Sequence, residues 1–165
     1  MQNYFQSIKL FFKRFLIVLF VYQICRFLFY FFNRNSFENI SAKGLLGGIH
    51  FDLSAIAYIN LIFVLFHLLP GNFKYKPNYQ KGLKIAFFVV NLIFILTNFV
   101  DFEYYKFTGR RSTFGMITAS GMENEIGGLI FSFLFEFWYL PLLALVLAFA
   151  FWKSIPNLKI TTKTS

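Results

Sequence analysis

The chain has 165 residues, of which 58% are hydrophobic and only 14% are charged, and its net charge is +9. Soluble domains are usually about half apolar and about a quarter charged, and 27 Phe residues are more than a soluble core of this size can bury. The composition therefore indicates a membrane protein. The basic residues flank apolar runs and form no patch on a soluble domain, which argues against a nucleic-acid partner.

Four apolar runs are long enough to cross a bilayer, so the sequence predicts an all-α, polytopic membrane protein. The expected helices are residues 10–32, 49–69, 83–100 and 129–152. Residues 1–152 then form a transmembrane domain, and residues 153–165 form a basic cytoplasmic tail. Residues 101–125, between the third and fourth runs, are polar and aromatic, and they predict an ordered interfacial segment.

The first run is longer than the apolar region of a signal peptide, and no small-residue cleavage site follows it. We therefore expect this helix to remain in the mature protein. Cys25, the only cysteine, lies inside it and cannot form an intrachain disulfide. A small apolar packing role is the simplest interpretation of Cys25.

Arg26, Asp52 and Glu136 are the candidates for polar residues with a role inside the membrane. Arg26 lies well inside the first run, so it should face the bundle or extend toward an interface. Asp52, near the start of the second run, either pairs with another group and marks a site or offsets the positive end of a helix dipole. Glu136 lies near the outer interface, beside the aromatic pair Trp138-Tyr139.

The distribution of charge predicts the orientation of the chain. With a cytoplasmic N-terminus, the inner flanks carry ten basic residues and the outer loops five. The inner ones are Lys9, Lys13, Arg14, Lys74, Lys76, Lys81, Lys84, Lys153, Lys159 and Lys163, and the outer ones are Arg34, Lys43, Lys106, Arg110 and Arg111. All seven acids fall on the outer half. The positive-inside rule therefore predicts that both termini are cytoplasmic.

The segment after the third run is the strongest candidate for a binding site. Arg110 and Arg111 can hold a phosphate through bidentate, charge-assisted hydrogen bonds. Tyr104 and Tyr105 can lie at headgroup depth and donate their hydroxyls. The alternative is an interfacial anchor in which Asp101 or Glu103 pairs with the arginines.

Motifs for catalysis are missing from the sequence. It has no Gly-rich phosphate loop, no HExxH and no GxSxG. His50 and His67 fall at opposite ends of the second run, so they cannot share a metal ion. We expect no metal site and no catalytic residue in this chain.

Three stretches give the chain a resemblance to a known family. The run Gly48-Ile49-His50-Phe51-Asp52-Leu53-Ser54 resembles the second membrane helix of bacterial lipoteichoic-acid-synthase-like proteins, which are phosphoglycerol transferases of the alkaline phosphatase and sulfatase superfamily. The run Asp101-Phe102-Glu103-Tyr104-Tyr105, continuing through Arg110-Arg111, resembles the segment after their third helix. Glu136-Phe137-Trp138-Tyr139 resembles the start of their fourth helix. Relatives often carry arginine at the position of His50, which argues against an anion site there.

The resemblance implies a membrane domain that anchors an extracellular catalytic domain. In this family the catalytic domain binds manganese or magnesium and transfers glycerol phosphate from phosphatidylglycerol, or cleaves related esters. The expected partners are therefore a membrane lipid such as phosphatidylglycerol and a sulfatase-like catalytic domain, which this chain lacks. The expected location is the bacterial cytoplasmic membrane. The alternatives are a non-enzymatic assembly or regulatory subunit and a transporter subunit.

Overall fold

The computed structural model describes residues 2–37, 42–69, 71–109, 111 and 134–157. Across these residues the chain is helical and contains no strand. The long helices are α1 (Gln2–Phe32), α2 (Ala42–Leu68), α3 (Pro77–Thr108) and α6 (Tyr139–Ser154). Two short 3-10 helices, η1 (Arg34–Ser36) and η2 (Asn72–Tyr75), lie between them.

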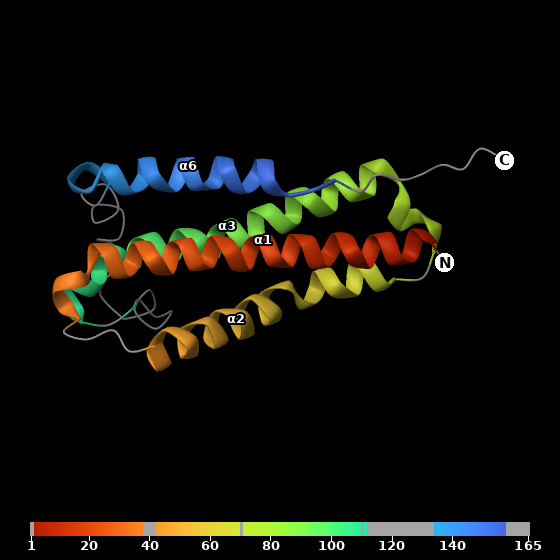
Figure 1. Ribbon diagram of the computed structural model, residues 1–165. Helices are drawn as coiled ribbons and strands as arrows, with labels where there is room; N and C mark the ends of the chain where they lie inside the picture. Colours follow the sequence, from red (N-terminus) through yellow and green to blue (C-terminus); the bar gives the residue numbers. More distant parts are fainter. Residues whose placement is uncertain (1, 38–41, 70, 110, 112–133, 158–165) are drawn as a thin grey trace, which may run out of the picture.

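The helices run alternately up and down along one common axis (Figure 1). Helix α1 lies in the middle and packs against α2, α3 and α6, while α3 also packs against both α2 and α6. Helices α2 and α6 lie on opposite sides of the α1–α3 pair. The fold therefore resembles an antiparallel bundle in which α1 is the central element.

Three of the helices are long and apolar enough to cross a membrane: Phe5–Phe32, Leu46–Leu68 and Pro77–Lys106. Helix α6 is shorter, with 16 residues. It starts next to Trp138 and contains Trp152 near its end, as expected for a helix whose ends lie near two interfaces. Over the described residues the all-α fold is confirmed, and these residues contain three candidate membrane spans plus one shorter apolar helix.

The helix bounds differ from those that the apolar runs predict. Helix α1 begins at Gln2 and therefore includes Lys9, and α2 begins at Ala42, ahead of the expected start at residue 49. Helix α3 continues through Asp101 and Glu103 to Thr108, so the first part of the expected interfacial segment is a continuation of the third helix. Residues 112–125 of that segment, residues 129–133 of the expected fourth span and residues 158–165 of the tail lie outside the described residues.

Local sequence signals account for two of the helix ends. Pro77 is the first residue of α3, where its missing N–H breaks no helical hydrogen bond. Gly109 follows α3 with φ 65°, and its N–H donates to the carbonyl of Tyr105 at 2.8 Å. This left-handed conformation is one that glycine adopts without strain.

The outside of the bundle is as apolar as its core. Buried side chains such as Val18, Ile56 and Phe87 form the contacts between helices. Phe20 and Phe51 are 67% and 74% exposed, respectively. Exposed phenylalanines on a bundle of this length are expected where the surrounding solvent is lipid. Cys25 is buried, in agreement with a packing role.

Candidate functional site

Arg26 and Asp52 form an ion pair between α1 and α2, within the apolar part of the bundle. Arg26 Nη2 lies 2.6 Å from Asp52 Oδ1, and Arg26 Nε donates to Asp52 Oδ2 at 2.9 Å. Gln23 Nε2 also donates to Asp52 Oδ2, at 3.1 Å. The side chains of Arg26 and Asp52 are only 12% and 14% exposed. Each charge is therefore compensated where water is scarce.

Asp52 is paired, as one of its two interpretations expects, while its role in a site stays a prediction. Helix α2 begins at Ala42, so Asp52 is well inside the helix and does not lie in its first turn. Arg26 faces the bundle, which is one of the two orientations expected for it. Neither Gln23 nor the pairing of the two charges was predicted, although two opposite charges in adjacent apolar runs were a signal for it.

Gly48 makes room for the Arg26 side chain. The carbonyl of Gly48 accepts a hydrogen bond from Arg26 Nη2 at 2.7 Å. A Cβ atom at position 48 would overlap Nη1 of Arg26. The glycine therefore allows the guanidinium group to lie against the α2 backbone and to reach Asp52 in the next turn.

A second interhelical contact joins α2 to α3 deeper in the bundle. The side-chain amides of Asn60 and Asn91 exchange two hydrogen bonds, each 2.9 Å long. Each amide also donates to the carbonyl four residues earlier in its own helix, those of Ile56 and Phe87. Both asparagines are fully buried. The pair satisfies its own polar atoms, which makes it a structural contact between the helices.

At the end of the bundle where α1 and α3 finish, Glu103 joins α3 to α6. It is 3% exposed and accepts hydrogen bonds from Lys106 Nζ and from the Tyr139 hydroxyl, both at 2.6 Å. Tyr139 also stacks on Phe32 of α1. This contact fixes the first turn of α6 against the other helices.

The same end carries the predicted lipid-headgroup residues. The guanidinium of Arg111 lies over the ring of Phe29, 4.4 Å from its centroid. Tyr105 stacks on Phe37 with an interplanar angle of 16° and meets Phe29 edge-on. Tyr104 is half-buried, and Arg110 lies outside the described residues.

Asp101 and Glu103 were the expected competitors for the arginines. Both are buried, and Glu103 is bonded to Lys106 and Tyr139. Arg111 is exposed, and its contact within the described part of the chain is the Phe29 ring. A cation–π contact uses the face of the guanidinium and leaves its N–H edges available as donors.

Other candidate residues are not part of these sites. Glu136 is exposed, and His50 is exposed and meets Phe51 edge-on. His67 is buried toward the opposite end of α2, and its Nδ1 lies 2.7 Å from the carbonyl of Phe63, which makes Nδ1 the protonated nitrogen. Among the described residues, no three His, Cys, Asp or Glu side chains come together in a way that would suit manganese or magnesium.

Comparison with known proteins gives no relative: no protein-family profile, curated protein or solved structure matches this chain. The resemblance to lipoteichoic-acid-synthase-like proteins therefore depends on the quoted sequence runs alone. The functional argument has to come from the geometry described above.

Proposed function

We propose that this chain is a membrane-anchoring domain that holds a glycerophospholipid headgroup at the end of the bundle where α3 finishes. In this proposal the chain lies in a bacterial cytoplasmic membrane with both termini in the cytoplasm, so the site faces outward. It has no catalysis of its own and serves a sulfatase-like or phosphoglycerol-transferring catalytic partner of the lipoteichoic-acid-synthase type. That partner, with its manganese or magnesium ion, rests on the sequence resemblance.

One observation carries the lipid site: Arg111 is exposed while the nearby acids are buried. The guanidinium of Arg111 packs with one face on Phe29, with its Cζ 4.4 Å from the ring centroid. The carboxylate of Glu103 accepts hydrogen bonds from Lys106 and Tyr139. A positioned guanidinium whose N–H edges meet no acid among the described residues suits a phosphate, which accepts two parallel hydrogen bonds from an arginine. The surrounding aromatic side chains suit the depth of lipid headgroups.

Retention of lipid by the purified chain in native mass spectrometry tests this proposal. The comparison uses phosphatidylglycerol with the wild type, Arg110→Lys, Arg111→Lys and the double variant. A simple anchor needs only positive charge, so lysine would replace arginine without loss. A bidentate site needs the planar guanidinium, so we expect retention to fall by about tenfold, on the scale of one charge-assisted hydrogen bond.

Two results would overturn the proposal. The first is equal retention of phosphatidylglycerol by all four proteins, which would make the arginines anchors. The second is equal retention of phosphatidylcholine and phosphatidylglycerol by the wild type, because the zwitterionic headgroup has no net negative charge. Arg34→Lys is a matched control, since Arg34 is an exposed arginine at the same end of the bundle.

A further inference from the structure

A groove lies between α1 and α6 on the outside of the bundle. Its volume is about 280 Å³, and its walls are the side chains from Leu16 to Ile24 on α1 and from Leu147 to Ser154 on α6. Leu16 and Phe20 at its margin are largely exposed, so the groove opens toward the surrounding lipid. The hydroxyl of Ser154 donates to the carbonyl of Ala150 within α6. The walls therefore offer an apolar surface and no open polar group for a polar ligand.

The shape of the groove suits one extended hydrocarbon chain. Residues 16–24 of α1 cover about 12 Å along the helix axis, at about 1.5 Å per residue. Pockets for whole drug-sized ligands have volumes of about 300–1,000 Å³, so this groove is narrow for a cofactor. Helices α1 and α6 lie side by side along its length (Figure 1).

Positive charge gathers at one end of the groove. Lys13 lies on the same face of α1 as Ile17, Phe20 and Ile24, because positions 13, 17, 20 and 24 follow helical spacing. Lys13 is exposed, one turn beyond the last apolar wall residue. Lys9 is exposed one turn further along α1.

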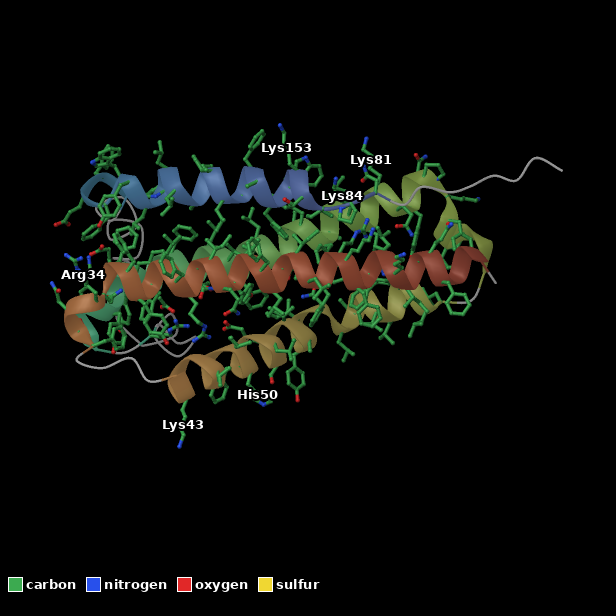
Figure 2. The ribbon with its side chains drawn as sticks, in the orientation of Figure 1. Arg34, Lys43, His50, Lys81, Lys84 and Lys153 are labelled. Carbon is green, nitrogen blue, oxygen red and sulfur yellow. The ribbon has the colours of Figure 1, made fainter. Side chains whose placement is uncertain are left out.

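Further cations surround this end. Lys84 and Lys153 lie close to the C-terminal end of α6 (Figure 2). In contrast, Arg34 and Lys43 lie toward the opposite end of the bundle and are not part of this group. Lys84 Nζ lies 4.6 Å from the ring centroid of Trp152.

Arg14 adds a buried cation to this group. It is fully buried, and its Nε and Nη2 donate to the carbonyl of Pro156 at 3.3 and 3.1 Å. Its Nη1 has no hydrogen-bond partner within the part of the chain that the structure describes.

No acid compensates this charge within the described residues. The four described acids, Asp52, Asp101, Glu103 and Glu136, all belong to the half of the bundle where α1 ends. A group of cations at a membrane interface without nearby acids attracts anionic headgroups, at about 1 kcal/mol for each Lys or Arg.

We propose that this groove binds an anionic phospholipid of the leaflet nearer the N-terminus, with one acyl chain between α1 and α6 and its phosphate on Lys13. The apolar walls select a lipid over a free anion, and the cations at one end select a negative headgroup over a neutral one. This site is separate from the Arg111 site, which lies at the other end of the bundle and in the other leaflet.

The test uses the full chain, purified in detergent, and phosphatidylglycerol that carries a photoreactive diazirine in one acyl chain. We expect crosslinks to concentrate on residues 16–24 and 147–154. Ala150→Phe fills the groove with an aromatic ring and should reduce this labelling by about fivefold or more. Ala57→Phe is the matched control, because Ala57 is an exposed alanine on α2, away from the groove.

Headgroup recognition is tested by Lys13→Gln, which removes an exposed charge and leaves the bundle packing unchanged. We expect about a fivefold loss of labelling, the effect of one interfacial charge, with recovery in Lys13→Arg. Lys43→Gln, at the opposite end, should label like the wild type. Dihexanoyl phosphatidylglycerol, whose chains are too short to fill the groove, should compete poorly.

Several outcomes would overturn the proposal. These are labelling spread evenly over the exposed faces of α2 and α6, unchanged labelling in Ala150→Phe, and effective competition by the short-chain lipid. Arg111→Lys should leave the labelling of residues 16–24 unchanged. The two lipid sites can therefore fail or succeed independently.

Discussion

Arg26 on α1 and Asp52 on α2 neutralise each other at a separation of 2.6 Å, beside a glycine whose missing side chain leaves room for the guanidinium. The pair joins two helices, and Gln23 of α1 adds a further hydrogen bond to Asp52. We expect the pair to affect the free energy of unfolding mainly when one partner is removed. A single uncompensated charge inside the bundle destabilises the fold far more than the absence of both charges.

Removal of one partner should therefore be worse than removal of both. Asp52→Leu or Arg26→Leu alone should lower the free energy of unfolding by roughly 3–5 kcal/mol. The double variant should lose less than either single one, because no uncompensated charge remains. Thermal or SDS-induced unfolding in detergent measures these differences. Glu136→Leu, at an exposed acid, is the control, and equal losses for the single and double variants would contradict this role of the pair.

Gly48 and Gly47 allow a matched test of the space for Arg26. A Cβ atom at Gly48 would overlap the Arg26 guanidinium, whereas at Gly47 it would have no neighbour within 4 Å. Gly47→Ala should stabilise the helix by up to about 1 kcal/mol, the usual gain from alanine in a helix. Gly48→Ala should destabilise the protein despite the same gain. The same unfolding assay decides this, and similar effects at both positions would mean that the guanidinium moves aside easily.

Removal of one side chain of the Asn60–Asn91 pair should also destabilise the protein more than removal of both. The loss of unfolding free energy should be smaller than for the ion pair. Asn60→Leu leaves the Asn91 amide without its partner inside the bundle. We expect a loss of about 1–2 kcal/mol, the range for polar contacts between membrane helices. Asn60→Leu with Asn91→Leu should recover part of it. Asn98→Leu is a control, because among the described residues the Asn98 side chain bonds within its own helix, to the carbonyl of Phe94.

The proposed orientation is tested by single-cysteine labelling in a Cys25→Ser background. Cysteine at position 43 should react with an impermeant reagent in intact cells, and cysteine at position 76 should react only after the membrane is opened. Position 43 is exposed near the start of α2, and position 76 is exposed immediately before α3, at the opposite end of the bundle. Reaction at position 76 in intact cells would reverse the orientation and place the Arg111 site in the cytoplasm.

The proposed lack of catalysis has a direct test. The purified chain should neither hydrolyse phosphatidylglycerol nor transfer glycerol phosphate, with or without manganese. Within the described residues, no cluster of metal-ligating side chains offers a site for such chemistry. Turnover that persists through purification to homogeneity and depends on manganese would show that this proposal is wrong.

The apolar runs predicted where helices lie, because length and hydrophobicity are enough for that. They predicted the ends of α1 and α2 to within one residue, but they did not predict where these helices begin or where α3 begins and ends. Helix α1 begins at Gln2, ahead of Lys9, and α3 extends through Asp101 and Glu103, because a helix does not have to stop where the apolar environment stops. Local residues mark two of the ends in the structure: Pro77 begins α3, where its missing N–H breaks no helical hydrogen bond, and Gly109 ends it, because glycine adopts the left-handed conformation without strain.

The pairing of polar residues was harder to predict than their presence. Arg26, Asp52 and Asn91 stood out in the sequence, but their partners depend on how each helix is rotated. In a soluble helix the apolar stripe gives that rotation. Here the exposed face carries Phe20 and Phe27 and the buried face carries Phe29, so both faces are equally apolar. The contacts of Gln23 and Asn60 therefore required the structure.

The length of α6 has a consequence for the surrounding lipid. Its 16 residues reach about 24 Å along the axis, less than the roughly 30 Å of a typical hydrocarbon core. The three longer helices have no such deficit. In the proposed orientation, in which α6 also spans the bilayer, the membrane should thin on the α6 side or draw its headgroups inward there, at a cost of fractions of a kcal/mol per Å. The bundle is therefore asymmetric in hydrophobic thickness, and it should favour thinner, more deformable membranes on the side where α1 and α6 meet.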